Sequence, residues 1–401
     1  MAEVVVALIR DTHTHTEREQ EERERERVER KGKVEKMVLY MLRSLAFATT
    51  GYYNFTRDGY IRASKSFEPN ALDVDMSGRT VVVTGANTGI GFATAQALAK
   101  RRASVHLVCR NEKRGTDAVE KIRAAQPDAH VTLHTCDLSS LESVRAFATE
   151  WKDTKRGPVH VLVNNAGCMV HDREKRSAEG YDINFATNTL GTFVFTRLME
   201  PSLRDASGAR VITVSSGGML TEPLVIDDLQ GETLRPYDAV RQYARDKRRQ
   251  VALTELWASR EARRDAETAA TSSGTDNEQK TKDAASTNNM SGRIEYYSMH
   301  PGWSETDGLS VALPTMTKRM GGKGGNLRDW DMAADTIVWL AVVRTDGDSD
   351  VVLHPGEFYL DREPARKVTP LDFGVGKYSL KQVELLEEKL ESMAGLPSAR
   401  A

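Results

Sequence analysis

A glycine-rich turn between an apolar strand and a helix constrains this chain more than any other feature. Residues 81–83 are three valines and predict a buried strand, and residues 92–100 are good helix formers. The turn between them contains Gly85, Gly89 and Gly91. A helix N-terminus offers unpaired N–H groups and a favourable dipole to an anion, and glycines let the backbone come close to it. The pattern therefore predicts a dinucleotide pyrophosphate site, with a tight structural turn as the alternative.

The composition is that of a globular protein. The chain has 401 residues, of which 39% are apolar and 28% are charged, enough for one large α/β domain or two small ones. A formal charge of −2 gives no bulk attraction to nucleic acid, so no nucleic-acid partner is expected. Three cysteines favour a reducing compartment over a disulfide framework. No apolar run has the length of a membrane span, and no secretory leader pattern is present, so we expect a cytoplasmic location.

The N-terminal region is unusual in its charge. Residues 17–36 are nearly all Glu, Arg and Lys, which cannot bury a core and predict a solvated helix or a disordered tail. We predict a charged, disordered extension over 1–36 and a helical lead-in over 37–77, with Met37 as the hypothetical ancestral start. Residues 37–49 are apolar on most sides, and we expect them to pack on the core or to lie on a membrane surface. The aromatic residues that follow fit either role: Tyr52, Tyr53, Phe55 and Tyr60.

Predicted strands and helices alternate from residue 79 onward. The predicted strands are 81–83, 104–108, 131–134, 159–163, 210–214, 294–298 and 357–360. The predicted helices are 90–101, 114–125, 139–152, 184–204 and about 238–264. Repeated strand–helix units with short apolar strands predict an α/β fold, a doubly wound and mostly parallel sheet with helices on both faces. We expect one Rossmann-type, three-layer domain over 78–377.

Two segments near the C-terminus depart from this alternation. Residues 265–292 are polar and of low complexity, which predicts a disordered surface insertion. Residues 378–401 are predicted to form a terminal helix and tail. The apolar face of that helix, over 378–393, would consist of Leu380, Val383, Leu386, Leu390 and Met393.

Polar residues follow the second and third predicted strands. Arg110 ends the second strand, where a dinucleotide fold faces the adenosine ribose. An acidic residue there would bind the ribose hydroxyls, whereas an arginine pairs with a 2′-phosphate. Arg110 therefore favours NADP(H), with Arg114 as a second contact and a solvated surface arginine as the alternative. Asp137, after the third strand, is expected to accept a hydrogen bond from adenine, to cap the next helix, or both.

A tyrosine and a lysine carry the predicted chemistry. Tyr243 and Lys247 lie one helical turn apart, on one face. A phenol with a pKa of about 10 is a poor acid–base catalyst at neutral pH, and a nearby ammonium group would lower that pKa. Most such pairs are accidental surface neighbours. This pair follows a strand that ends in two serines, of which Ser216 could hydrogen-bond the same substrate oxygen as Tyr243.

Together these motifs resemble the short-chain dehydrogenase/reductase family. The matching segments are Thr84-Gly85-x-x-x-Gly89-x-Gly91, Asn164-Asn165-Ala166-Gly167, Ser216, Tyr243-x-x-x-Lys247 and Pro301-Gly302-x-x-x-Thr306. They occur in the family's order, and the resemblance covers roughly 78–345. Shorter segments resemble a branch that is similar to the retinol-dehydrogenase-like reductases and whose substrate is poorly defined. These segments are 52–60, 106–110, 165–170, 211–220, 228–230 and 298–303.

The resemblance implies hydride transfer between NADP(H) and a carbonyl or secondary alcohol. It makes Tyr243 the acid/base, with Lys247 lowering its pKa and holding the nicotinamide ribose. It also implies that Ser216 orients the carbonyl and that Asn188 supports a proton relay through water. Thr306 would bind the carboxamide, or would be an ordinary loop hydroxyl. The expected cofactor contacts are Gly85, Asn87, Thr88, Gly89, Ile90, Gly91, Arg110, Asp137, Leu138, Asn165, Ala166, Gly167, Tyr243, Lys247, Pro301, Gly302 and Thr306. No metal site is expected.

The chain also departs from the family pattern. Thr88 stands where many NADP-dependent members carry Lys or Arg, so the NADP(H) assignment rests on Arg110. The separation of Ser216 and Tyr243 is longer than in the shortest members, and we expect residues 217–237 to form part of the wall of the substrate pocket. A lipophilic substrate is suggested by apolar neighbours of the motifs, which core packing explains equally well. These neighbours are Met169, Val170, Met219 and Leu220.

Two other functions remain open at the level of sequence. The first is an NADP(H)-binding scaffold or redox sensor with little catalysis, which the complete Ser-Tyr-Lys set argues against. The second is a nucleotide-sugar epimerase, whose usual glycine spacing this chain lacks. Peripheral membrane contact through 37–60 is compatible with each function. A homodimer through the helices that carry Asn188 and Tyr243 is compatible with each as well.

Overall fold

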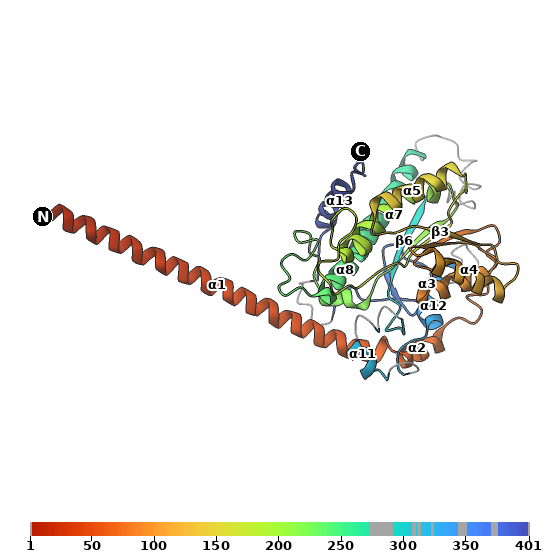
Figure 1. Cartoon of the computed structure of the whole chain (residues 1–401), viewed down its shortest axis with the longest axis horizontal. Helices are drawn as coiled ribbons and strands as arrows, with labels where there is room; N and C mark the ends of the chain where they lie inside the picture. Colours follow the sequence, from red (N-terminus) through yellow and green to blue (C-terminus); the bar gives the residue numbers. More distant parts are fainter. Residues whose placement is uncertain are drawn as a thin grey trace.

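The central feature of the fold is a twisted sheet with helices on both faces (Figure 1). The computed structural model describes residues 2–272, 292–306, 310, 314–321, 325–343, 351–369 and 376–399. The strands in these residues are β1 (Thr80–Thr84), β2 (Ser104–Cys109), β3 (Val131–Thr135), β4 (Val161–Asn164), β5 (Ala209–Val214), β6 (Ile294–Met299), β7 (Phe358–Leu360) and β8 (Glu363–Pro364). They lie in the order β3-β2-β1-β4-β5-β6-β7-β8, and only the β7–β8 pair is antiparallel. The predicted doubly wound, mostly parallel sheet is therefore confirmed.

Two hydrophobic clusters lie on opposite faces of this sheet. One cluster is covered by α3 (Gly89–Lys100), α4 (Glu112–Ala125) and α12 (Trp330–Val342). The other is covered by α5 (Leu141–Asp153), α7 (Thr192–Arg204), α8 (Ala239–Ser272) and α13 (Leu380–Ala394). Val81 and Val83 belong to the first cluster and Val82 to the second, because successive side chains of a strand point to opposite faces. A strand that is buried on both faces needs a continuous apolar run, which is the pattern this sequence has.

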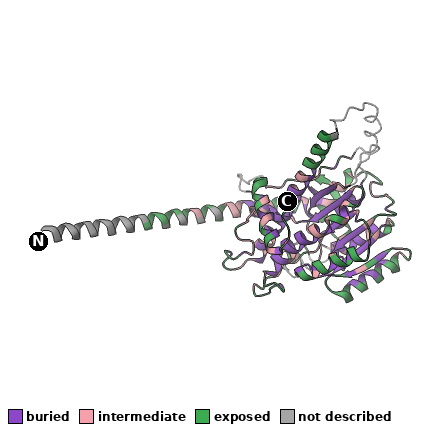
Figure 2. Ribbon diagram, turned by 90° about the horizontal axis from the view of Figure 1, so that it is seen from above, coloured by how far each residue is buried: buried purple, intermediate pink, exposed green. Residues whose placement is uncertain are grey.

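A single long helix, α1 (Ala2–Asn54), projects from the domain at its N-terminal end (Figure 1). Residues 17–36, predicted as a solvated helix or a disordered tail, lie within it. Figure 2 shows that burial begins toward the C-terminal end of α1, where it meets the domain. Ala46 and Phe55 are buried there, whereas Tyr52 and Tyr53 are more than 60% exposed. The lead-in thus packs on the core through one side and leaves the other side in solvent.

Short helices connect this lead-in and the βα units. They are α2 (Arg57–Ala63), η1 (Ser64–Ser66), α6 (Ile183–Phe185), the π-helical turn η2 (Ala186–Gly191), η3 (Gly217–Thr221) and α11 (Pro314–Arg319). The predicted helix over 184–204 is thus divided into α6, η2 and α7. Among the described residues, no helix is both long and apolar enough to span a bilayer.

Several element boundaries differ from the predicted ones. Helix α8 continues to Ser272, so it includes the first part of the low-complexity segment 265–292; residues 273–291 lie outside the described part of the chain. Helix α12 was not predicted at all. Its N-terminus is capped by Asp329, whose carboxylate accepts from the Met332 N–H at 2.8 Å, but its residues are buried on nearly every side. A helix that is apolar all round has no amphipathic period to detect.

The C-terminal helix α13 has a shorter buried face than its sequence suggests. Ser379 and Gln382 form a capping box at its N-terminus. Val383, Leu386 and Leu390 are fully buried against the cluster under α8, as predicted. Leu380, however, is 42% exposed. It lies in the first turn of the helix, where the predicted apolar face has not yet reached the core.

Candidate active site

The glycine turn between β1 and α3 has the backbone that an anion site needs. Gly85 and Gly89 have φ values of 65° and 61°, a region that favours glycine. A Cβ on Gly91 would lie 2.5 Å from the Gly85 carbonyl oxygen, so a side chain there has no space. Thr88 precedes α3 without a side-chain cap, which leaves the first-turn N–H groups available to an anion. The other predicted contacts of this turn, Asn87 and Ile90, are partly exposed beside it.

The motif after β4 lies directly against this turn. The Asn165 side-chain amide donates to the Thr84 carbonyl oxygen at 2.9 Å. The Thr84 hydroxyl oxygen accepts from the backbone N–H groups of Asn165 and Ala166, each at 3.0 Å. Gly85 approaches so closely that a Cβ on it would lie 2.9 Å from the Ala166 Cα. Two motifs from neighbouring strands thus form one surface, on which Gly167 is exposed.

The segment after β6 reaches the same surface. The Thr306 Cγ2 atom is 3.5 Å from the position of a Cβ on Gly89, so Thr306 lies over the glycine turn. Gly302 has a φ of 78° and packs against the Arg328 guanidinium, which a side chain would displace. Pro301 is partly exposed at the start of this segment. The structure therefore brings Thr306, which is far along the chain, next to the first motif.

On the side that we expect to face the adenosine, Arg110 is exposed immediately after the C-terminal end of β2. After the neighbouring strand β3, the Asp137 carboxylate accepts from the Ser139 N–H at 2.9 Å and from the Ser139 hydroxyl at 2.7 Å. The N-cap of α5 is Ser140, so the helix-capping role considered for Asp137 is wrong. Asp137 makes a local turn instead, because the helix begins later than predicted. Leu138 is buried, and its carbonyl packs against Gly191.

The three predicted catalytic side chains come together at the C-terminal end of β5. Ser216 follows that strand and caps η3, while Tyr243 and Lys247 lie on α8. A side-chain hydrogen bond joins Tyr243 and Ser216. The Lys247 ammonium lies 5.4 Å from the centroid of the Tyr243 ring. Two segments that are separate in the sequence thus bring Ser216, Tyr243 and Lys247 together.

The pKa values of this group differ from the expectation. Burial raises the pKa of Tyr243, and the hydrogen bond with Ser216 opposes that rise only in part. Desolvation of the phenolate sets the direction of this shift, and Lys247 is not among the groups that lower the pKa of Tyr243. Burial also lowers the pKa of Lys247 to about 8, against the attraction of Asp246. At neutral pH the phenol is protonated, which suits a proton donor to a carbonyl oxygen.

Asn188 lies in the π-helical turn η2, a kind of irregularity that often marks functional sites. Its side-chain oxygen accepts from the Cys168 N–H at 2.9 Å, and its side-chain amide donates to the Cys168 carbonyl at 2.8 Å. These two bonds hold the backbone just after Gly167. The side chain of Asn188 thus positions the backbone of Cys168. Its role in a water relay stays a prediction.

Gln250 is a residue of the site that the sequence does not predict. It connects Lys247 on α8 with Asn188 in η2. Its side-chain amide donates to the Asn188 carbonyl at 2.6 Å, and its side-chain oxygen accepts from the Lys247 ammonium at 3.1 Å. The ammonium also donates to the Val214 carbonyl at 2.8 Å. The only sequence signal for Gln250 is its place three residues after Lys247, on the same helix face. Its amide thus joins Lys247 to Asn188 directly.

Residues 217–237, expected to wall the substrate pocket, are held against α8 by ion pairs of the buried Glu222 and of Asp228. The Glu222 carboxylate is 1% exposed and lies 2.7 Å from Arg241 Nε and 3.1 Å from Arg245 Nε. Arg245 also lies 3.0 Å from the Asp228 carboxylate. The four apolar residues predicted near the substrate divide into two groups. Met219 and Leu220 are buried in the core, whereas Met169 and Val170 are partly exposed.

Comparisons with known proteins point to one family of enzymes. A family model described as short chain dehydrogenase matches residues 79–223. Human dehydrogenase/reductase SDR family member 12 is 38% identical over 359 residues, which are 89% of this chain and 99% of the human protein. Mouse retinol dehydrogenase 12 is 39% identical over 160 residues, 40% of this chain and 50% of that protein. A short-chain type dehydrogenase/reductase from Mycobacterium marinum shares the fold, with a TM-score of 0.52 and 20% identity over 72% of this chain and 96% of that one.

Proposed function

The chain belongs to the short-chain dehydrogenase/reductase family of oxidoreductases, and from this premise we propose that it interconverts a lipophilic carbonyl compound and its alcohol with NADP(H). Tyr243 is the acid/base in this proposal. The observation that carries it is the meeting of Ser216, Tyr243 and Lys247 beside the glycine turn and the Asn165 motif. The human relative, which aligns over nearly its whole length, is named as a dehydrogenase/reductase and supports the same reaction class.

The residues around the glycine turn fit a dinucleotide. The uncapped N-terminus of α3 would hold the pyrophosphate, because its N–H groups have no side-chain partner and no Cβ blocks the approach. Asn165 to Gly167 and Thr306 would line the nicotinamide half, and Arg110 would pair with a 2′-phosphate. When bound, the nicotinamide supplies or accepts the hydride.

The chain's own side chains manage the proton and the charge on oxygen. Tyr243, kept protonated by burial, donates its hydroxyl proton to the carbonyl oxygen. The Ser216 hydroxyl, already hydrogen-bonded to Tyr243, orients the same oxygen and stabilises charge that develops on it. The Lys247 ammonium, fixed by Val214 and Gln250, favours the phenolate that remains. For alcohol oxidation the same steps run in reverse.

Replacement of Tyr243 by phenylalanine tests the proposal, because it removes the hydroxyl and keeps the ring. The wild-type chain should oxidise NADPH in the presence of at least one member of a panel of aldehydes, ketosteroids and retinal. Tyr243→Phe should lower kcat by about 10²- to 10⁴-fold, the usual contribution of general acid–base catalysis, while NADPH binding persists through the other cofactor contacts. Tyr52→Phe, on the exposed side of α1, is the matched control.

Two results would contradict the proposal in different ways. Undiminished turnover by Tyr243→Phe would remove Tyr243 from the chemistry. NADPH binding without turnover of any panel carbonyl would favour the alternative of a scaffold or redox sensor. Cofactor binding is followed by nicotinamide fluorescence, which does not depend on turnover.

A further inference from the structure

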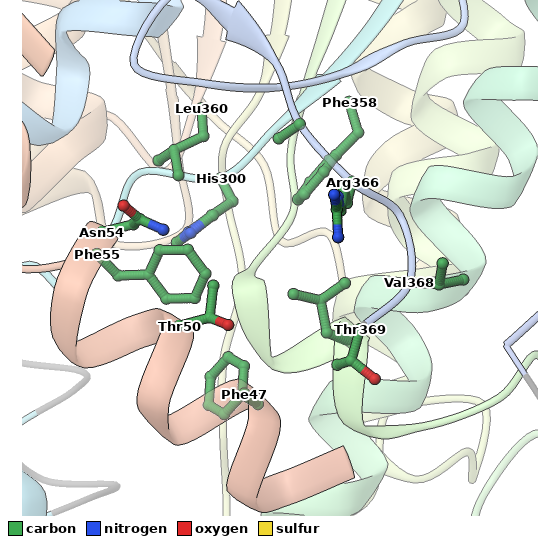
Figure 3. A pocket seen from close by; sticks show the side chains of 12 residues that line it. Phe47, Thr50, Asn54, Phe55, His300, Phe358, Leu360, Arg366, Val368 and Thr369 are labelled. Atoms are coloured by element: carbon green, nitrogen blue, oxygen red, sulfur yellow. The ribbon is translucent and has the colours of Figure 1, made fainter. Parts of the chain in front are cut away.

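A cavity of about 340 Å³ lies between the N-terminal helix and the C-terminal strands, outside the predicted catalytic and cofactor residues (Figure 3). Helix α1 and the residue that follows it supply one side. Ala365, Arg366, Val368 and Thr369, after β8, supply the other. Leu220, His300, Phe358 and Leu360 complete the lining. A volume of this size is within the range of about 300–1,000 Å³ that small-molecule sites have.

The walls of this cavity are mainly apolar. Phe47 and Phe55 approach from the side of α1, and Phe358 and Leu360 from β7 (Figure 3). The Phe55 ring stands edge-on to the His300 ring, with their centroids 4.2 Å apart. Aromatic and aliphatic walls of this kind exclude water and favour a hydrocarbon chain.

Two buried polar atoms in the lining have no partner in the described part of the chain. His300 is 2% exposed, and its Nδ1 atom accepts from the Gly302 N–H at 3.0 Å. Burial keeps the pKa of His300 well below its usual value, so the ring is neutral and the proton lies on Nε2. That N–H and the hydroxyl of Thr369, which is 4% exposed, form no hydrogen bond with the described residues. Unpaired buried polar groups are costly, and an oxygen atom of a ligand would satisfy them.

A positive charge lies on the side of the cavity that faces α1. The Arg366 side chain is exposed and lines the cavity together with Val368 and Thr369 (Figure 3). Within the described residues, its guanidinium forms neither a salt bridge nor a hydrogen bond. Guanidinium groups bind carboxylates through paired, charge-assisted hydrogen bonds. The lining thus combines a hydrocarbon surface with hydrogen-bond donors and one cation.

We propose that this cavity binds a fatty acid, with its chain between Phe47, Phe55 and Phe358. Its carboxylate pairs with Arg366 and accepts from the unpaired donors of His300 and Thr369. The inference is independent of the proposed hydride transfer, because no lining residue belongs to the catalytic set. Since α1 supplies part of the cavity wall, a bound fatty acid would also hold α1 against the domain. Leu220 belongs to the short helix η3 that Ser216 caps, so the occupied cavity lies beside the catalytic serine.

A matched pair of substitutions on α1 tests the location. Thr50 lines the cavity, whereas its neighbour Thr49 is exposed and does not. Calorimetric titration of the full chain with decanoate should show saturable binding. Thr50→Trp, which fills the cavity, should weaken that binding at least tenfold, and Thr49→Trp should leave it unchanged. No saturable binding by the wild type, or equal binding by both variants, would overturn the proposal.

A second pair tests the carboxylate, and it remains informative if Thr50→Trp does not fold. Arg366→Gln should weaken decanoate binding about tenfold and leave decanol binding unchanged, because decanol has no charge to pair. Arg263→Gln, an exposed position on α8, is the control. Decanoate binding that is unaffected by Arg366→Gln would overturn the assignment. Tyr243→Phe should bind decanoate as the wild type does, so failure of the enzymatic proposal remains a separate result.

Discussion

At the scale of single residues, the ammonium of Lys247 is held by two acceptors from different elements, the Val214 carbonyl and the Gln250 side chain. Burial nevertheless lowers its pKa to about 8. The charged form that would stabilise a Tyr243 phenolate is therefore lost within an accessible pH range. The pH profile of the proposed reaction should therefore show the titration of Lys247.

We expect kcat/KM for carbonyl reduction to be level below neutral pH and to fall as pH rises through about 8, because Lys247 then loses its proton. Gln250→Leu should move this fall to lower pH, since it removes an acceptor that favours the ammonium. Gln250→Asn is the conservative control for side-chain polarity. The measurement is the pH dependence of kcat/KM for the three proteins. An identical profile in Gln250→Leu would show that Gln250 does not act on Lys247.

The same titration affects stability with a defined sign. The pKa of Lys247 is about 8 in the folded chain and 10.5 for an ordinary lysine, so between these values the unfolded chain binds more protons. The contribution of Lys247 to the free energy of unfolding should therefore rise with pH across that interval. Below pH 8 the folded chain carries the full cost of burying the charge.

Arg110 determines the cofactor preference in our proposal. NADPH should bind more tightly than NADH, and Arg110→Asp should weaken NADPH binding by roughly tenfold or more, because a charge-assisted pair is replaced by repulsion. Fluorescence titration with both nucleotides measures this change. Arg263→Asp, on an exposed part of α8, controls for the loss of charge. Equal affinity of the wild type for NADPH and NADH would contradict the role of Arg110.

At the scale of elements, α8 contributes to the candidate site in three ways. It carries Tyr243 and Lys247, it holds the segment 217–237 through Glu222 and its arginine partners, and it packs against α13. The buried Glu222 carboxylate pairs with both Arg241 and Arg245, and its loss would leave Arg245 with Asp228 alone. The segment 217–237 is thus attached to the helix that carries Tyr243 and Lys247.

The packing of α13 can be tested with two adjacent leucines. Leu386 is fully buried, whereas Leu385 is 42% exposed. Leu386→Ala should lower the free energy of unfolding by about 2–5 kcal/mol, the usual cost of truncating a buried leucine. Leu385→Ala should change it by less than about 0.5 kcal/mol, as surface substitutions usually do. Urea unfolding gives both values. Similar losses for the two variants would show that α13 does not pack as described.

At the scale of the whole molecule, α1 carries an apolar stripe that the domain does not cover. Val34, Val38, Met41 and Leu45 are spaced by three or four residues, so they share a face, and each is at least 45% exposed. Interfacial helices bury such a face among lipid headgroups. Peripheral membrane contact, predicted for residues 37–60, would use this stripe.

We therefore expect the full chain to sediment with vesicles of phosphatidylcholine and phosphatidylserine. The double variant Met41→Glu/Leu45→Glu should remain in the supernatant, because it places charge on the stripe. Val28→Glu, an exposed apolar position outside the stripe, should sediment as the wild type does. Vesicle binding that survives the double variant would exclude this face.

Much of the fold and part of the site could be predicted from the sequence. The strand pattern, the glycine turn and the Tyr243–Lys247 spacing depend on local periodicity and backbone geometry, which a short stretch of sequence specifies. Helix α12 was missed because it is buried on nearly every side and shows no amphipathic period. The role of Asp137 as a helix cap was wrong because Ser140 is the N-cap of α5, which begins at Leu141.

The sequence by itself determined the doubly wound α/β class and the order of the motifs along the chain, because these follow from local residue patterns. Only the tertiary structure decided which residues connect the motifs through hydrogen bonds. Gln250 meets the carbonyl of Asn188 from a distant part of the chain. The cavity that we propose to bind a fatty acid is lined by residues of α1, η3 and β7 together. The direction of the Tyr243 pKa depends on burial, a property of the packed molecule that no spacing of residues encodes.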